Sequence, residues 1–477
     1  MIYSHRTKTQ YIYLFIVFLI QSSILLSAQS KLSGIQIINS GTATEISQYG
    51  ITWTFSKPVE YGTYINGDYW VVGPVEIVNI YPPSKNVAGR VINGSMVNPD
   101  PTRGGVHGFD SQPRDTRYSP DLNVARPGGQ DLSSVNSLLL QPGSSLVTSI
   151  SHPEPENRPQ LTDAAILTVI AAPPSSGSFR PPYCGSDKTS YYNYFQVDTA
   201  SLRSLAPVAN TPSLSSVTAA FKRPWLDFIP DWTQRDIHAS NNMPSYGRDL
   251  SSQVSIGALM LHLNYSQNEK KELLVGFLQL GIDLWGIVQN GGTNHWVPNG
   301  GHASGRKWPI LFAGIMFDDV NMMNLGPGDG SGVAVFGEDA QTFYVSQETI
   351  DITNGPDWVK DDKHDDHQPY DNSHLGMPEW GIRHATEPQR DDASWNRAYR
   401  TCCTATAWAG FVLSARIMDV VDLWDHDALF DYQDRYMELM NGNPDPFGYP
   451  AVNGQPTTHQ DYRGWTDFEE NMWDAYR

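Results

Sequence analysis

The pattern of apolar and polar residues divides the chain in two near Pro173. Before this point apolar residues alternate with polar ones, or form short runs ended by Gly and Pro, which is typical of β-strands. The stretch "GITWTFSKPVEYG" followed by "INGDYWVVGPVEIVNI" predicts a hairpin with Asn66-Gly67 at its turn, and "SLLLQPGSSLVTSIS" predicts a second with Pro142-Gly143. "AAILTVIAAPP" predicts a short buried strand ended by proline.

After Pro173 the period becomes that of a helix. The segment "YSQNEKKELLVGFLQLGIDLWGIVQNGG" has Ser266 and Glu269 spaced as a capping box, then apolar residues on one face, and Gly291-Gly292 as the stop. Further helices are expected over residues 250–264, 305–320, 338–350, 398–420, 423–441 and 466–477. We therefore predict an α+β multidomain fold, with an antiparallel β-sandwich over residues 29–173 followed by a catalytic, α/α-toroid-like helical domain over residues 174–477.

The first 28 residues have the pattern of a secretory signal peptide. Basic residues precede an apolar run from about Tyr11 to Leu26, and the small residues Ser27 and Ala28 follow it. The expected mature protein is secreted or periplasmic and has no integral membrane segment after signal cleavage. An uncleaved N-terminal anchor is the alternative, because the apolar run is long for a signal.

Composition narrows the classes of partner. A formal net charge of -19 argues against nucleic acid, whose phosphates such a surface would repel. The chain is rich in aromatic residues, whose faces pack against sugar rings in carbohydrate-binding proteins as well as filling cores. Three cysteines provide no disulfide framework, with one bridge as the most they allow. The pair Cys402 and Cys403 in a helical segment predicts two buried thiols rather than a metal or redox site.

Three loops, each leading into an expected helix, gather polar residues suited to chemistry. They read "HASNNMPSYGRD", "NHWVPNGGHASGRKW" and "MPEWGIRHATEPQRDDASWNRAYR". Asn, His, Tyr and Arg recur in all or most of them. This matching chemistry predicts one shared site.

Together, an export signal, a strand-rich half and helices joined by loops with these residues resemble the polysaccharide lyases that combine an α/α toroid with β-sandwich modules. They are similar to ulvan lyases and other uronate-polysaccharide lyases of marine Bacteroidetes. The resemblance implies β-elimination on an anionic, uronate-containing polysaccharide, sulfated or not. Separately, the sequence implies no organic cofactor, because no nucleotide-binding fingerprint follows a predicted strand.

Eliminative cleavage removes the C5 proton beside a carboxylate and expels the O4 oxygen, so the site must neutralise the carboxylate and supply a base and an acid. We expect Asn242 and Arg248 to neutralise the uronate, Tyr246 to be base, acid or both, and His302 to be the partner base or a further neutraliser. The alternative for Tyr246 and Arg248 is that they tie a loop to a helix N-terminus.

The remaining residues of the three loops are expected to bind substrate. Cationic and polar side chains would hold neighbouring acidic or sulfated sugars, and two tryptophans would be stacking platforms. These residues are Asn241, Asn299, Arg306, Lys307, Arg383, His384, Trp296 and Trp380. For Arg306 and Lys307 the alternative is a pair of solvated charges at the start of a helix, where the helix dipole disfavours cations.

The densest polar segment, "KDDKHDDHQPYDNSHLG", has imidazoles and carboxylates that suit a divalent cation, Zn²⁺ or Ca²⁺. No ordered metal signature is present, and a flexible acidic loop is the preferred interpretation. No metal ligand is therefore assigned.

Two other functions remain open. An inverting glycoside hydrolase would need two carboxylates ~6.5–9.5 Å apart, with Asp249, Asp319, Glu338 and Glu379 as candidates. A non-catalytic glycan-binding protein would need only the aromatic residues. The richness of the three loops in Asn, His, Tyr and Arg favours the lyase.

Overall fold

The fold was analysed in a computed structural model of the chain. It describes residues 40–112, 117–230, 236–243, 247–355, 369–381, 403–449 and 467–477. Residues Ser40–Arg477 cluster as one compact unit. The signal peptide expected over residues 1–28 lies outside the described residues, and the division at residue 173 stays a prediction.

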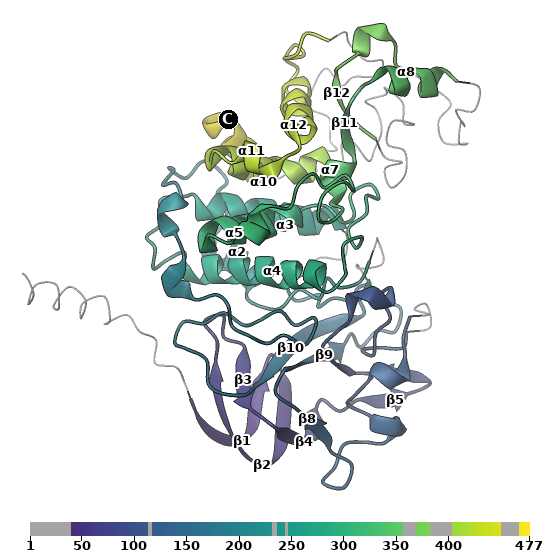
Figure 1. Cartoon of the computed structure of the whole chain (residues 1–477), viewed down its shortest axis with the longest axis vertical. Coiled ribbons are helices and arrows are strands. Elements are labelled where there is room, and N and C mark those ends of the chain that lie inside the picture. Colours follow the sequence, from purple (N-terminus) through teal and green to yellow (C-terminus); the bar gives the residue numbers. More distant parts are fainter. Residues whose placement is uncertain are drawn as a thin grey trace, which may run out of the picture. The chain divides into compact units, whose positions relative to one another are not determined.

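In the described part of the chain, ten strands precede the α-helices. They are β1 (Gly41–Gln48), β2 (Ile51–Thr63), β3 (Tyr69–Val72), β4 (Val75–Tyr81), β5 (Lys85–Val87), β6 (Arg90–Ile92), β7 (Ser95–Val97), β8 (Leu138–Leu140), β9 (Ser144–Ser151) and β10 (Leu161–Ile170). Eight of them form one curled sheet with the order β7-β9-β10-β3-β2-β4-β8, and β1 pairs with β2 beside this path. The strands and the helices that follow them are labelled in Figure 1.

Pairing in the sheet confirms one predicted hairpin and corrects the other. β2 and β3 pair antiparallel around a turn that contains Asn66-Gly67, as expected. The second hairpin is wrong: β8 pairs with β4, whereas β9 pairs with β10 and β7, so the two strands flanking Pro142-Gly143 lie far apart in the sheet order. The backbone N–H of Gly143 instead donates to the carbonyl of Val169 at the end of β10.

The sheet is mixed, because β10 runs parallel to β3 while its other pairings are antiparallel. The expectation of a wholly antiparallel arrangement is therefore wrong for this pair. β10 is buried on both faces, since Ala164 and Ile166 belong to one apolar core and Ala165, Leu167 and Val169 to another. Residues that alternate along a strand point to opposite faces, which explains the unbroken apolar run of this strand.

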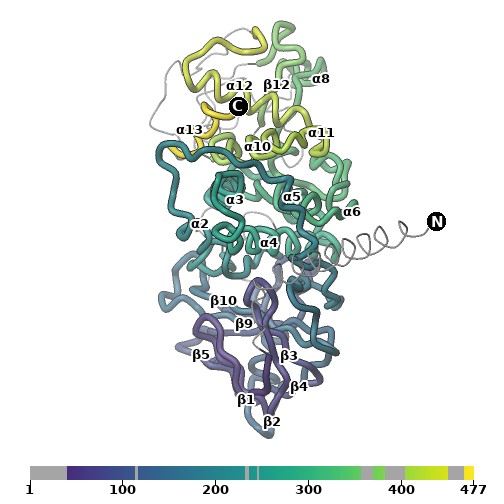
Figure 2. The backbone as a smooth tube through the Cα atoms, turned by 90° about the vertical axis from the view of Figure 1, so that its left-hand side faces the viewer, coloured from purple at the N-terminus to yellow at the C-terminus, as the bar shows by residue number. Residues whose placement is uncertain are grey.

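The helices follow the sheet in the chain, and the tube in Figure 2 traces this course from purple to yellow. The described part of the chain contains eleven α-helices: α2 (Leu214–Phe221), α3 (Gly247–Leu261), α4 (Lys271–Gln289), α5 (Lys307–Phe317), α6 (Val320–Met323), α7 (Gly337–Ala340), α8 (Gln347–Asn354), α10 (Ala405–Ile417), α11 (Val421–Trp424), α12 (Asp427–Met440) and α13 (Asp467–Tyr476). The fold is thus mixed α+β. The helix expected over 338–350 is wrong, because this segment forms α7, the strand β11 (Thr342–Tyr344) and the start of α8; β11 pairs with β12 (Pro378–Trp380).

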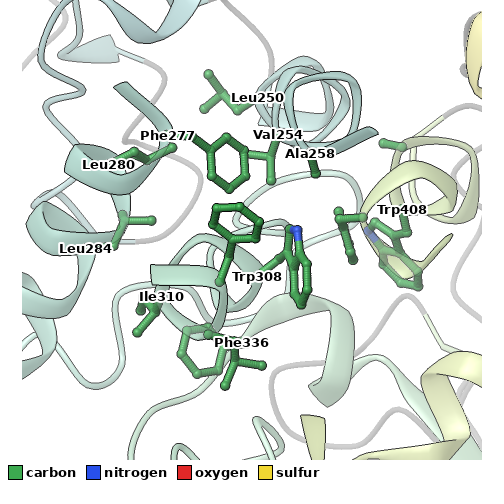
Figure 3. Close-up of a cluster of buried hydrophobic side chains, with 14 of the residues drawn as sticks. Leu250, Val254, Ala258, Phe277, Leu280, Leu284, Trp308, Ile310, Phe336 and Trp408 are labelled. Carbon is green, nitrogen blue, oxygen red and sulfur yellow. The ribbon is translucent and has the colours of Figure 1, made fainter. Parts of the chain in front are cut away.

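Helices α3, α4, α5 and α10 carry the larger apolar core. Val254 and Ala258 of α3 and Phe277 of α4 meet Trp308 of α5 in this cluster (Figure 3). Phe277 packs edge to face on Phe312, with ring centroids 5.1 Å apart. By length and composition α4 could cross a bilayer, yet 89% of its most apolar stretch is buried inside the protein.

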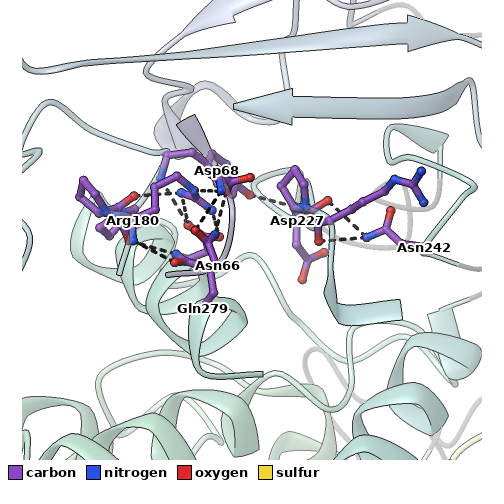
Figure 4. A network of polar contacts seen from close by, with 12 residues as sticks. Asn66, Asp68, Arg180, Asp227, Asn242 and Gln279 are labelled. Atoms are coloured by element: carbon purple, nitrogen blue, oxygen red, sulfur yellow. Dashed lines mark hydrogen bonds and ion pairs between the residues drawn. The ribbon is translucent and has the colours of Figure 1, made fainter. Parts of the chain in front are cut away.

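A buried ion-pair network joins the β2–β3 turn to α4 (Figure 4). The guanidinium of Arg180 binds Asp283 through Nη1 and Nη2, at 2.9 and 2.5 Å, and Asp68 through Nε at 2.6 Å. The side-chain amide of Gln279 pairs with the backbone N–H and carbonyl of Arg180, at 3.1 and 3.0 Å. Two carboxylates and the carbonyl of Pro181, which accepts from Nη1 at 2.9 Å, thus satisfy a fully buried cation, as burial of a charge requires.

Candidate functional site

The glycine-rich loop before α5 is buried and conformationally strained. Residues 300–306 are all buried, and Ala303 has a φ of 66°, a left-handed conformation that a residue with a β-carbon adopts at a cost. The backbone N–H of His302 donates to the carbonyl of Asn299 at 3.1 Å, which closes the preceding turn. Strained backbone of this kind concentrates at functional sites, where the surrounding structure holds it in place.

Segments far apart in the sequence converge on His302, whose exposed fraction is 8%. A β-carbon on Gly247, the first residue of α3, would lie 2.7 Å from Nδ1 of His302. A β-carbon on Gly301 would lie 2.8 Å from Cβ of Cys403 and 3.0 Å from Cβ of Arg248. We call Gly247, Arg248, Gly301, His302 and Cys403 the His302 cluster. The cluster joins the end of the first predicted loop, the second loop, and Cys403, which lies three residues after the third.

Glu338 anchors the His302 loop from its other side. Its carboxylate accepts hydrogen bonds from the backbone N–H groups of Gly305, at 3.0 Å, and Lys307, at 3.4 Å. Burial, together with the adjacent charge of Asp339, raises the pKa of Glu338 to about 7. A carboxylate at this position also faces the positive end of α5 and stabilises it.

The asparagines of the first loop contact β10 and the segment that follows α2. Asn241 donates through Nδ2 to Asp163 at 2.7 Å, and Asn242 donates to the carbonyls of Arg223 and Pro224 at 3.3 and 3.4 Å. Asn241 is exposed, whereas Asn242 is buried near Asp227, as Figure 4 shows. These contacts attach the loop to β10 on one side and to the segment after α2 on the other. A role for either residue in neutralising a uronate stays a prediction.

Arg248, in contrast, keeps about a third of its side chain exposed and forms an ion pair with Asp249 at 3.0 Å. The other three hydrolase candidates also have partners or are buried. Asp319 caps α6 and accepts a hydrogen bond from the hydroxyl of Tyr192 at 2.7 Å. Glu338 is buried, and Glu379 is fully buried with Arg435 4.0 Å away. These four carboxylates are engaged in structural contacts.

Arg306 and Lys307 are not the substrate-binding cations that the sequence predicts. Arg306 is 1% exposed and binds Asp227 through Nε at 2.7 Å. Lys307 is fully buried, with Nζ 2.5 Å from Asp339 and 2.5 Å from the carbonyl of Trp424. The prediction fails because each cation has an acidic partner distant in sequence, and these carboxylates offset the unfavourable helix dipole.

The two predicted stacking platforms are also buried. Trp296 is 0% exposed and stacks on Phe336, with ring centroids 5.7 Å apart. Trp380 is 1% exposed, lies in β12, and donates through Nε1 to Gln341 at 3.1 Å. Neither ring presents a face to a sugar, so the stacking role is wrong for both.

Several predicted residues lie outside the described residues: Tyr246, Arg383, His384, and His364, Asp365, Asp366 and His367 of the acidic segment. At the end of that segment, Asp371 and His374 cap one short helical turn, with the N–H of Asp371 donating to Nδ1 of His374 at 3.1 Å. Among the described residues no group of three or more His, Cys, Asp or Glu is placed to hold a metal ion.

Cys403 is disulfide-bonded, and Cys184 is a free, buried thiol. The expectation of two buried thiols at 402–403 is therefore wrong for Cys403. Since Gly301 contacts Cys403, the disulfide lies against the loop that carries His302.

A pocket of about 640 Å³ opens near the other end of the same loop. Its lining comes from four segments: Asn294, Val297 and Pro298; Asp329, Gly330 and Val335; Asp339, Ala340, Thr342, Phe343 and Tyr344 of α7 and β11; and His426, Asp427 and Ala428 at the start of α12. We call it the acidic pocket. None of its acidic residues, nor His426, was predicted from the sequence as a site residue. The stretch "WDHDAL" nevertheless places an imidazole between two carboxylates at a helix start.

Hydrogen bonds define the tautomer of the neutral His426 ring. Its Nε2 lies 3.0 Å from Oγ1 and 3.1 Å from the carbonyl oxygen of Thr342. A carbonyl only accepts, and the Thr342 hydroxyl donates to the carbonyl of Glu338 at 3.0 Å, so Nε2 carries the hydrogen. In neutral His426 the lone pair is therefore on Nδ1, which makes no hydrogen bond to the described residues.

Comparisons with known proteins identify no relative: no family model, curated protein or solved structure matches the chain.

Proposed function

We propose that the protein is an exported polysaccharide lyase that cleaves a uronate-containing polymer by β-elimination, with the His302 cluster as its catalytic centre. The observation that carries the proposal is the convergence of Gly247, Arg248 and Cys403 on the strained loop of His302. This convergence supports the expectation that loops entering different helices share one site. The helical part would be toroid-like and the strand-rich part sandwich-like, as in the lyases that the sequence resembles.

In the proposed reaction Arg248 neutralises the substrate carboxylate, which makes the C5 hydrogen more acidic. His302 takes that proton, because an imidazole titrates near neutral pH. The electron pair of the C5–H bond forms the C4–C5 double bond, and the C4–O4 bond breaks with its electrons leaving on O4. An acid returns a proton to O4, a role that suits Tyr246, the residue directly before Gly247.

A hydrolase is less well supported. The four carboxylates that the sequence nominates are held by Arg248, by a helix cap and tyrosine hydroxyl, by backbone N–H groups, and in a fully buried position beside Arg435. An inverting hydrolase needs a free pair across a space that holds water and substrate. Because these carboxylates already have partners within the protein, structural roles suit them better than catalysis. The lyase is therefore the better-supported reaction.

The test is ultraviolet absorbance of purified mature protein mixed with uronate polymers, including ulvan, alginate, pectin and glucuronan. We expect absorbance to rise on at least one polymer, because elimination leaves a double bond conjugated with the carboxylate. His302→Ala and Arg248→Met should each lower the rate at least about 100-fold, the range for loss of a general base. Ser252→Ala, on the same helix as Arg248, is the matched control and should keep the rate.

New reducing ends without the absorbance change would replace the lyase by a hydrolase. Binding of a polymer with neither product would indicate a glycan-binding protein. Full activity in the His302→Ala variant would remove the His302 cluster from the mechanism.

A further inference from the structure

The acidic pocket has fixed walls, so its shape is present before any ligand binds. The N–H of Val335 donates to the carbonyl of Thr293 at 2.8 Å, which ties the two loops of the lining together. Asp339 accepts from Trp424 Nε1 at 2.7 Å and from the N–H of Gly328 at 2.9 Å, in addition to its ion pair with Lys307. A preformed site of this size suits a small part of a polymer.

We propose that the acidic pocket is a binding subsite for a neutral sugar residue. The inference rests on the proposed function in so far as the substrate is a glycan. Combined with the uronate at the His302 cluster, it makes the substrate a mixed polymer that contains both acidic and uncharged sugars.

Asp329 and Asp427 are exposed at the pocket, where their carboxylate oxygens can accept hydrogen bonds from a ligand. Asp329 accepts from Ser331 through Oδ1 only, while Asp427 and Nδ1 of His426 accept from no described residue. Burial raises the pKa of Asp329, but its hydrogen bonds from Ser331 oppose this effect, and the pKa lies below its usual value, so the carboxylate stays ionised. Sugar hydroxyls are the donors that such a set of acceptors would bind.

Charge excludes the acidic sugars. The lining contains Asp329, Asp339 and Asp427, and among the described residues it contains no lysine or arginine. Lys307 neutralises the charge of Asp339 through a buried ion pair. The charges of Asp329 and Asp427 remain to repel a carboxylate or sulfate. Phe343 and Tyr344 add aromatic surface for the apolar face of a sugar ring.

The position of the pocket links it to the proposed catalytic centre. Pro298 lines the pocket and His302 is four residues further along the same loop, a span of at most about 14 Å even for extended chain. One glycan chain can therefore reach both places. The sugar bound in the pocket would then determine which uronate meets His302.

The experiment is isothermal titration of the full-length mature protein with neutral oligosaccharides built from glucose, xylose, mannose, galactose or rhamnose, and with oligomers of galacturonate and glucosamine as charged probes. We expect at least one neutral oligomer to bind, and His426→Ala and Asp427→Asn each to weaken it about tenfold or more, as expected for losing a hydrogen bond to a charged or imidazole acceptor. Asp425→Asn is the matched control: this exposed aspartate is two residues from Asp427 and outside the lining, and should leave affinity unchanged.

The titration separates the two proposals, because it requires no cleavage. A neutral oligosaccharide could bind in a way that depends on His426 and Asp427 while the protein cleaves no polymer by elimination. That result would support the subsite and would contradict the proposed lyase activity. The subsite proposal would be overturned if only the galacturonate or glucosamine oligomers bound, or if no oligomer bound. It would also be overturned if a neutral oligosaccharide bound equally well to the wild type and to both variants.

Discussion

Gly247 and His302 are in such close contact that no side chain fits between them: a β-carbon on Gly247 would lie 2.7 Å from both Cα and Nδ1 of His302. The start of α3 therefore fixes the position of the imidazole that we propose as the base. Since nearby Gly301 is crowded by Cys403 and Arg248, the cluster depends on two glycines for its closeness.

Gly247→Ala should lower activity by at least about tenfold and should also destabilise the fold. A β-carbon would lie 2.7 Å from the backbone Cα of His302, so the backbone of the His302 loop has to shift to make room for it. Activity and thermal unfolding of this variant, measured beside Ser252→Ala, would check the expectation. Wild-type activity in Gly247→Ala would mean that the position of His302 is unimportant for the reaction.

Lys307→Met should destabilise the fold by about 3–5 kcal/mol, because it leaves Asp339 as an uncompensated buried charge. The matched control is Lys222→Met, since the Lys222–Glu272 pair is exposed at 3.8 Å and should contribute less than about 1 kcal/mol. Urea unfolding measures both. Adding Asp339→Asn to Lys307→Met should recover part of the loss, whereas an additive loss would argue against coupling of the two charges.

Glu338 should make the fold less stable as the pH rises. Burial raises its folded-state pKa from the ordinary 4.5 to about 7, so its protonated form is favoured in the folded protein. The resulting stability is fully present below about pH 4.5 and is lost as the pH rises through about 7. The unfolding free energy of wild type, relative to Glu338→Gln, should therefore fall by on the order of 3 kcal/mol between pH 4.5 and 8. Parallel curves for the two proteins would show that Glu338 does not titrate in this range.

Thiol counting tests the cysteine assignment. The chain has three cysteines, Cys184 is free and Cys403 is disulfide-bonded. Alkylation in denaturant without reductant should label one thiol per chain, and prior reduction should raise the number to three, as read by intact mass. Three labelled thiols without reduction would rule out the bond.

Local patterns predicted those parts of the fold that depend on neighbours in sequence. Helix α4 and the buried strand β10 were predicted from the spacing of apolar residues, which is visible within a short segment. The hairpin around Asn66-Gly67 follows from turn chemistry, but the same reasoning failed at Pro142-Gly143, because a turn bends the chain without choosing the strand that each arm will pair with.

The candidate site shows the same limit. The sequence identified the loop around His302, because glycines and a histidine before a helix are visible in a short stretch. It did not reveal that Arg306 and Lys307 are neutralised by Asp227 and Asp339, or that Trp296 stacks on Phe336, because each partner is separated from it by dozens of residues. The acidic pocket was missed for the same reason, since its lining is assembled from four separate segments.

By itself, the sequence determined the helical and strand periods, the acidic net charge and the loops that carry reactive side chains. Only the tertiary structure decided which cations are buried, which carboxylates face a pocket and which residues meet at His302. The physical reason is that burial and charge pairing depend on distance in space, and packing of a core brings together residues that no local pattern relates.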